Sequence, residues 1–300
     1  IRKYLKEFLS DTRVIEVNPI LWKVILNLFI LTFRPSKTAK AYREIWMEKE
    51  NMSPLRYYTQ MQMKKLKEKI NDKKIIISYA MRYGSPSIKN VMKKIQEDGC
   101  DNIIILPLYP QYAAPTTATV CDEVYRTLMK MRWQPNLQII SHYESEPLYI
   151  DALVNSLNKK IKEINWTPDL IIASYHGIPK KYFEKGDPYH CYCQKTTRLL
   201  SEKFKKIPIK TTFQSRFGPK DWLQPYTDKT LENLPNEGKK NVLVICPGFS
   251  SDCVETLEEI SIQGKESFLK FGGKNFDAVP CLNDNQDHIN LFKHLIKKYI

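Results

Sequence analysis

The stretch "LIIASYHGIP", residues 170–179, decides the fold of this chain. Its first six residues form a near-continuous apolar run, which is typical of a strand buried on both faces of a parallel sheet. Amphipathic helical segments separate it from six similar runs, at residues 75–80, 103–108, 137–142, 209–214, 241–247 and 276–281. This alternation predicts an α/β fold in which parallel sheets are flanked by helices.

Seven strands exceed one small sheet, and 300 residues provide enough chain for two domains. We therefore expect two βαβ halves that divide near residue 140. No low-complexity linker marks the join, so the two halves should pack closely.

The net charge of +14 would suit nucleic acid or an anionic membrane surface. No basic stripe with interleaved aromatic residues is present, so we expect no nucleic-acid partner and interpret the excess of lysine as solvated helix faces. The seven cysteines are odd in number and scattered, which favours a reduced cytoplasmic setting over a disulfide framework. Neither a dinucleotide-binding glycine motif, a phosphate-binding loop nor a nucleophile elbow occurs in the sequence.

Polar groups follow several predicted strands, and ligands of open parallel sheets bind beyond the carboxyl ends of the strands. Arg82 and Tyr83 follow the run at 75–80, His176 follows 170–175, and Gln214 and Ser215 follow 209–213. We expect these residues from both halves to line one crevice. At that position His176 is either a hydrogen-bonded histidine or a group that accepts a proton or binds a metal.

A second group of candidates lies in "SSDCVETLEEI", residues 250–260. Asp252, Glu255 and Glu259 are three and four residues apart, which would place them on one face of an α-helix. Such carboxylates form either a solvated acidic first turn or a track for protons or a hard divalent cation. The preceding strand directs them toward the same crevice as His176, which favours the second interpretation.

The cysteines of "HCYC", residues 190–193, do not have the spacing of a zinc site. Cys191 and Cys193 are two residues apart, and no second pair matches them. We therefore expect neither bound zinc nor an iron–sulfur cluster.

The most apolar segment is "NPILWKVILNLFILTFRP", residues 18–35, which is shorter than the ~20 apolar residues of a membrane-spanning helix. Lys23, Asn27 and Arg34 share one side of a helical wheel. The segment is either a buried core helix or a lip that enters a bilayer interface or contacts an apolar ligand.

Four motifs together resemble the ferrochelatase family and occur in the family order: "PLYPQYAAPTTATV" (107–120), "SYHGIPKKYFEKGDPY" (174–189), "TFQSRFGPKDWLQPYTDKTL" (212–231) and "CPGFSSDCVETLEEI" (246–260). The resemblance covers the whole chain and is to the bacterial type. It implies two Rossmann-like domains, residues 1–140 with the lip and residues 141–283 with the histidine and the acidic helix. The C-terminal helix, 284–300, would join the first domain, and a porphyrin cleft would lie between the domains.

The same resemblance implies insertion of Fe²⁺ into protoporphyrin IX with release of two protons, the last step of heme biosynthesis. Iron is then a substrate, and no cofactor is needed. His176 and Glu255 would bind the metal and carry the catalysis, and Asp252 and Glu259 would form an acidic path. The porphyrin-binding residues implied by the resemblance or by their place at strand ends are Arg34, Tyr42, Ser53, Arg82, Tyr83, Tyr109, Gln214, Ser215 and Trp222.

Two departures from the family pattern are visible. Cys253 stands where animal enzymes have a histidine, and Ile1 leads directly into a helix where the family has an apolar first strand, so we expect that strand to be missing. No cysteine follows Cys281, where cluster-bearing relatives place theirs. We expect a cytoplasmic monomer or dimer, peripheral to the inner membrane through residues 19–33. The alternatives are a chelatase for coproporphyrin or cobalt, and a tetrapyrrole-binding protein without turnover.

Overall fold

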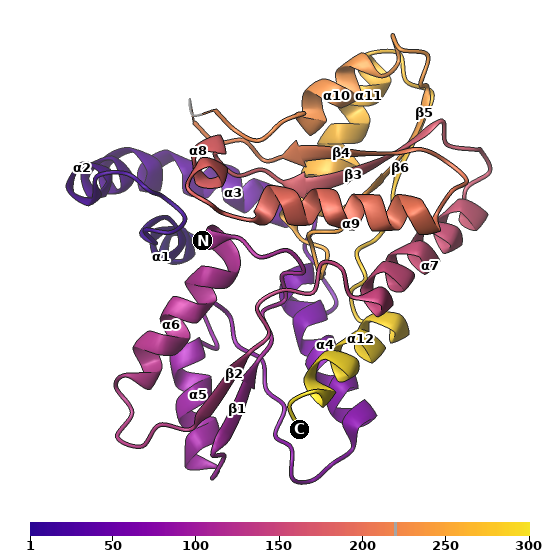
Figure 1. The fold of residues 1–300 in the computed structure, drawn as a ribbon. Helices are drawn as coiled ribbons and strands as arrows, with labels where there is room; N and C mark the ends of the chain where they lie inside the picture. The colour runs from indigo at the N-terminus through magenta and orange to yellow at the C-terminus, as the bar shows by residue number, and fades with distance from the viewer. Residues whose placement is uncertain (219–220) are drawn as a thin grey trace.

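The computed structural model describes residues 1–218 and 221–300 and confirms an α/β fold with two parallel sheets flanked by helices (Figure 1). The first sheet pairs β1 (Asn102–Ile105) with β2 (Asn136–Ile139) in parallel. The second has the strand order β4-β3-β5-β6 and lies after residue 140 in the sequence. Its strands are β3 (Leu170–His176), β4 (Ile209–Gln214), β5 (Asn241–Ile245) and β6 (Asn275–Ala278).

The first 130 residues also form the α-helices that precede and follow β1. They are α1 (Arg2–Leu9), α2 (Pro19–Ile25), α3 (Leu31–Glu44), α4 (Pro54–Ile70), α5 (Ile88–Glu97) and α6 (Thr119–Leu128). Two π-helical turns, η1 (Leu26–Ile30) and η2 (Ala114–Ala118), precede α3 and α6. Ile88 and Met92 of α5 bury their side chains against Val120 and Val124 of α6, and this cluster covers one face of the sheet.

The run at 75–80, predicted as a strand, is not a strand in the structure. Within the described residues no neighbouring backbone pairs with it, and a β-ladder needs a partner chain ~4.8 Å away. The side chain of Ile77 packs instead against Leu66 of α4 and Phe292. The apolar pattern therefore reports only partial burial here, since Ile76 is 42% exposed, and no strand pairing.

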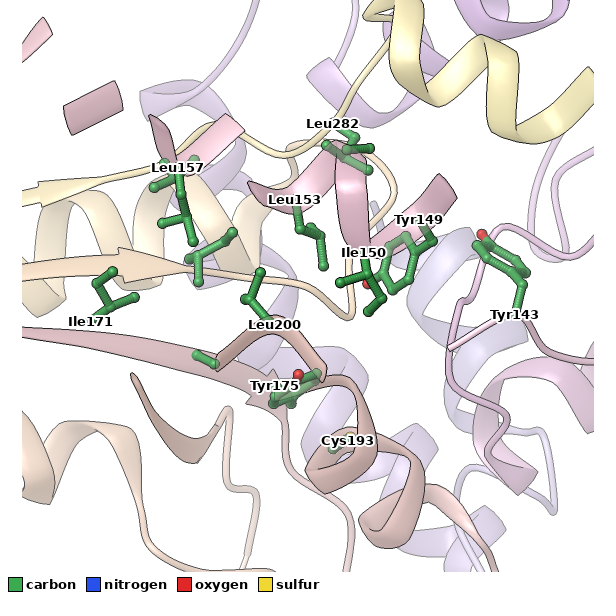
Figure 2. Close-up of a cluster of buried hydrophobic side chains, with 14 of the residues drawn as sticks. Tyr143, Tyr149, Ile150, Leu153, Leu157, Ile171, Tyr175, Cys193, Leu200 and Leu282 are labelled. Atoms are coloured by element: carbon green, nitrogen blue, oxygen red, sulfur yellow. The ribbon is translucent and has the colours of Figure 1, made fainter. Parts of the chain in front are cut away.

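The second sheet is enclosed by α7 (Pro147–Glu163), α8 (Lys180–Glu184), α9 (Tyr189–Lys203), α10 (Thr227–Asn233), π-helix η3 (Val254–Gly264) and α11 (Lys265–Lys270). Residues 170–175 of β3 are all buried, as expected for a strand covered on both faces. Figure 2 shows Ile171 and Tyr175 of β3 packed with Leu153 and Leu157 of α7 and Leu200 of α9.

The C-terminal helix α12 (Gln286–Lys297) lies against both α4 and α7 (Figure 1). Ile289 and Phe292 pack with Leu66 of α4, whereas Leu291 and Leu295 join the large hydrophobic core around β3, α7 and α9. The helix therefore ties the two sheets together through apolar contacts on two of its faces.

The apolar segment 18–35 forms α2, η1 and the start of α3, and we call it the lip. Leu26 and Leu31 are buried against Leu5 and Leu9 of α1. Other side chains face outward: Ile20 is 80% exposed and Phe33 is 71% exposed. A fully buried core helix is therefore wrong for this segment. Among the described helices, none has the length and apolar character needed to cross a bilayer.

Candidate active site

His176 is the last residue of β3, and Gly177 follows it directly outside the strand. The Nδ1 atom of His176 lies 2.6 Å from the carbonyl oxygen of Gly177. Because a carbonyl only accepts, Nδ1 must carry the proton and donate it. In the neutral imidazole, Nε2 is then the basic nitrogen, which can accept a proton or bind a metal.

Gly177 permits a close approach that no other residue would allow. A Cβ at this position would lie 2.9 Å from the backbone oxygen of Gln214 and 3.3 Å from a ring carbon of Trp222. The N–H of Gly177 donates to that same oxygen of Gln214 at 2.7 Å. The glycine therefore brings the indole of Trp222 beside the end of β3.

The acidic segment forms the π-helix η3, which begins at Val254 after the N-cap residue Cys253. We predicted that Asp252, Glu255 and Glu259 share one α-helical face. The structure differs for Asp252, because it lies before the helix begins. Its carboxylate accepts hydrogen bonds from Thr256 Oγ1, Cys281 N and Asn283 Nδ2 at 2.9, 3.2 and 2.7 Å. Asp252 is thus buried in loop packing, whereas the two glutamates lie within the helix.

Glu259 reaches the end of β4, next to His176. Its carboxylate accepts hydrogen bonds from the backbone N–H of Ser215 at 2.8 Å, from the Ser215 hydroxyl, and from Gln214 Nε2 at 3.3 Å. Gln214 is the register partner of His176 across the two strands. Burial raises the pKa of Glu259, although these hydrogen bonds and the charge of the nearby His176 oppose the shift.

Three tyrosines from the N-terminal part of the chain lie close enough to Glu255 for its charge to affect them. Burial raises the pKa of Tyr4, Tyr42 and Tyr109, and the negative charge of Glu255 adds to each shift. The pKa of Tyr42 rises to about 12, so its hydroxyl stays protonated at neutral pH. The predicted residues Tyr42 and Tyr109 are therefore brought to Glu255. Tyr4 was not among the predicted site residues. Its spacing from Phe8, one helical turn away, indicates only an aromatic pair.

Arg82 and Tyr83 both contact Asp11, which lies two residues beyond the end of α1. The guanidinium of Arg82 is paired with Asp11 and donates to the carbonyl oxygen of Thr119 at 2.7 Å. The Tyr83 hydroxyl donates to the same Asp11 carboxylate at 3.0 Å. Asp11, which the sequence analysis missed, therefore anchors the end of α1. Arg82 and Tyr83 thus hold Asp11 in place, and their predicted contact with porphyrin stays a prediction.

Arg34 of the lip lies over the ring of Phe217, which follows β4 in the chain. Its guanidinium carbon lies 4.3 Å from the centre of that ring, and burial lowers the pKa of Arg34. The indole N–H of Trp222 donates to the carbonyl oxygen of Phe217 at 3.2 Å. The predicted residues Arg34 and Trp222 thus come together around Phe217. Ser53 is the N-cap of α4, and no hydrogen bond joins it to the other predicted residues in the described parts of the chain.

The residues of "HCYC" have different surroundings. The ring of His190 stacks on Phe213 with 5.7 Å between ring centres, Cys193 is buried, and Cys191 is exposed. Over residues 1–218 and 221–300, no group of three or more histidine, cysteine, aspartate or glutamate side chains is arranged to hold a metal ion.

Comparison with known proteins identifies the family of this chain. The ferrochelatase family model matches residues 1–300. The chain belongs to the ferrochelatase family. It is 49% identical to the ferrochelatase of Francisella tularensis subsp. novicida over 304 aligned residues, which cover 100% of this chain and 90% of that protein. It is 50% identical to the ferrochelatase of Allorhizobium ampelinum, with 99% of this chain and 88% of that protein covered.

These relatives confirm the predicted ferrochelatase, a metal chelatase that inserts iron into a porphyrin in heme biosynthesis. Two solved chelatases share the fold. SirB from Bacillus subtilis has a TM-score of 0.57 and 14% identity, covering 82% of this chain and 91% of its own. CbiX, the terminal enzyme of siroheme biosynthesis in denitrifying bacteria, has a TM-score of 0.53 and 12% identity, covering 87% of this chain and 93% of its own.

Proposed function

We propose that His176 and Glu255 hold Fe²⁺, that His176 also accepts the pyrrole protons of protoporphyrin IX, and that Glu259 belongs to an acidic path that receives these protons in turn. The observation that carries this proposal is the hydrogen bond from His176 Nδ1 to Gly177, which leaves Nε2 as the basic nitrogen. A neutral imidazole is suited to this step because its ordinary pKa lies near ambient pH.

Insertion replaces two N–H protons of the macrocycle with one ferrous ion. A flat porphyrin presents its nitrogen lone pairs poorly, so binding energy is best used to hold the ring in a bent form. Glu259 lies next to the end of β3, where His176 would release a proton. Its raised pKa makes it a better proton acceptor than an ordinary glutamate. Asp252 stays a candidate member of this acidic path.

The macrocycle would lie against aromatic side chains from both domains. Trp222 and Phe217 supply ring faces, and Tyr42 and Tyr109 supply neutral hydroxyl groups near Glu255. Arg34, held over Phe217, is a suitable partner for a propionate because guanidinium and carboxylate form two parallel hydrogen bonds. The propionates would then mark the edge of the site near the lip.

The test is metal insertion followed by absorbance under anaerobic conditions, with Fe²⁺ and Zn²⁺ in separate reactions. Protoporphyrin IX and coproporphyrin are compared at the same concentrations. We expect turnover with protoporphyrin IX and a higher kcat/KM for it than for coproporphyrin. Tight porphyrin binding without metal insertion would contradict the assignment as a chelatase. A higher kcat/KM for coproporphyrin would contradict protoporphyrin IX as the substrate.

We also propose that the lip contacts an anionic membrane surface from the cytoplasmic side. Six large apolar side chains of the lip are exposed, namely Ile20, Leu21, Val24, Leu28, Phe29 and Phe33. Residues 18–43 contain five lysines and arginines but no aspartate or glutamate. Apolar burial combined with basic charge is the usual basis of interfacial binding.

Vesicle sedimentation tests this membrane proposal. We expect binding to vesicles that contain phosphatidylglycerol and weaker binding to phosphatidylcholine alone. The double change Ile20→Asp and Phe33→Asp should abolish binding. Met129→Asp, at an exposed apolar residue beyond α6, is the matched control and should bind like wild type. Equal binding by the lip variant would contradict the proposal.

A further inference from the structure

Gln214 is almost completely buried, with 3% of the residue's surface exposed. Both ends of its amide are engaged. Its Nε2 donates to the backbone oxygen of Glu255 at 2.8 Å and to the Glu259 carboxylate at 3.3 Å, and its Oε1 accepts from the Ser174 hydroxyl at 2.7 Å. Protein groups therefore engage both ends of this amide, and the direct porphyrin contact predicted for Gln214 stays a prediction.

The orientation of the amide follows from its neighbours. The carbonyl of Glu255 and the carboxylate of Glu259 are acceptors, so the end of Gln214 that faces them must be the NH₂ group. The oxygen end then faces Ser174, which must donate its hydroxyl hydrogen to it. If the amide were flipped, its oxygen would face the Glu255 carbonyl and the Glu259 carboxylate, and neither could donate a hydrogen bond to it.

Two threonines continue the same chain of hydrogen bonds into the core. The Ser174 hydroxyl lies 2.9 Å from that of Thr227, which in turn lies 2.8 Å from that of Thr212. Each hydroxyl has one hydrogen, and Ser174 has used its own on Gln214. Thr227 must therefore donate to Ser174, and Thr212 must donate to Thr227. All three are buried, so the direction of the whole network is set within the protein.

We infer that Gln214 is a positioning residue that holds the acidic π-helix against His176. It ties two successive turns of η3, at Glu255 and Glu259, to the end of β4, where Gln214 is the register partner of His176. The hydroxyl network through Ser174 keeps the donor end of the amide toward the glutamates. This inference rests on the roles proposed above for His176 and the two glutamates.

The experiment compares steady-state insertion kinetics of wild type with Gln214→Glu, which keeps the shape and the acceptor for Ser174 but removes the NH₂ donors. We expect kcat to fall ~10- to 100-fold, as for other supporting residues of metal sites. KM for the porphyrin should stay within about twofold, because protein groups engage both ends of the Gln214 amide. Thr227→Val, one step further from the helix, should lower kcat less than Gln214→Glu does.

Gln111→Leu is the matched control. Gln111 is as deeply buried as Gln214 but donates to Thr196 of α9 and not to η3. We expect it to lower the unfolding temperature while kcat per folded molecule stays at the wild-type value. An unchanged kcat in Gln214→Glu, a change confined to KM, or an equal loss of kcat in Gln111→Leu would each overturn the inference. Absence of insertion by wild type would instead refute the proposed function, so the two failures are distinguishable.

Discussion

His176 donates a 2.6 Å hydrogen bond from Nδ1 to the carbonyl oxygen of Gly177, its own neighbour in the chain. The contact decides which imidazole nitrogen is basic, because the carbonyl has no hydrogen to offer. The N–H of Gly177 also donates to the backbone oxygen of Gln214. The backbone of Gly177 therefore both sets the tautomer of His176 and extends the pairing of β3 with β4.

The first prediction concerns His176 as the proton acceptor. His176→Ala should lower kcat for metal insertion ~10²- to 10⁴-fold, the usual contribution of general base catalysis. His190→Ala is the matched control, since that ring stacks on Phe213 and has no role in the proposed chemistry. Absorbance-based insertion assays check both variants. Full turnover in His176→Ala, or an equal loss in His190→Ala, would contradict the assignment.

The second prediction concerns Asp11, whose side chain is 8% exposed beside Arg82 at 14%. Asp11→Ala leaves a buried guanidinium without its partner, so the free energy of unfolding should fall by ~3 kcal/mol. Asp122→Ala breaks the exposed pair with Arg13, and its cost should stay below ~1 kcal/mol. Urea denaturation measures both changes. Similar costs for the two variants would mean that Asp11 does not anchor α1.

The third prediction separates the hydroxyl of Ser215 from its backbone. Ser215 has φ +65°, in the left-handed region that glycine adopts without strain. Ser215→Gly and Ser215→Ala both remove the hydroxyl bond to Glu259, but only alanine keeps a Cβ in this conformation. The glycine variant should therefore be more stable than the alanine variant by ~1 kcal/mol. Thermal unfolding of the pair provides the measurement, and a more stable alanine variant would exclude strain at this residue.

The fourth prediction concerns His288 on α12, which is fully buried and donates from Nδ1 to the carbonyl oxygen of Asn283 at 2.6 Å. Burial lowers the pKa of His288 to about 4. Between that pH and its ordinary pKa of ~6.5, the unfolded chain binds a proton that the folded protein does not. Stability from this group is therefore present above the higher value and is lost as the pH falls toward the lower one.

The expected loss between pH 7 and pH 5 is ~2 kcal/mol of unfolding free energy. His288→Gln removes the titration, so its stability should decrease less than that of wild type over this range. Urea denaturation at the two pH values measures the effect. An unchanged pH dependence in His288→Gln would assign the acid sensitivity to other groups.

Much of the site was predictable because its signals are local. A buried parallel strand followed by His176, Gly177 and a proline is visible in ten residues, and Glu255 and Glu259 lie in one short acidic segment. The place of Asp252 was not predictable, because spacing arguments assume an α-helix. The chain instead forms a π-helix that begins two residues after Asp252, and loop residues Cys281 and Asn283 take up its carboxylate.

By itself the sequence determined the alternation of strands and helices, the strand-end position of His176 and the family to which the chain belongs. Those features depend on residues that are close together in the chain. Tertiary structure alone decided that residues 75–80 pair with no strand among the described residues, that Asp11 meets Arg82, and that the Gln214 amide turns toward η3. The physical reason is that each of these outcomes needs a partner group from a distant segment, and a hydrogen bond or ion pair exists only where packing brings its two partners within reach.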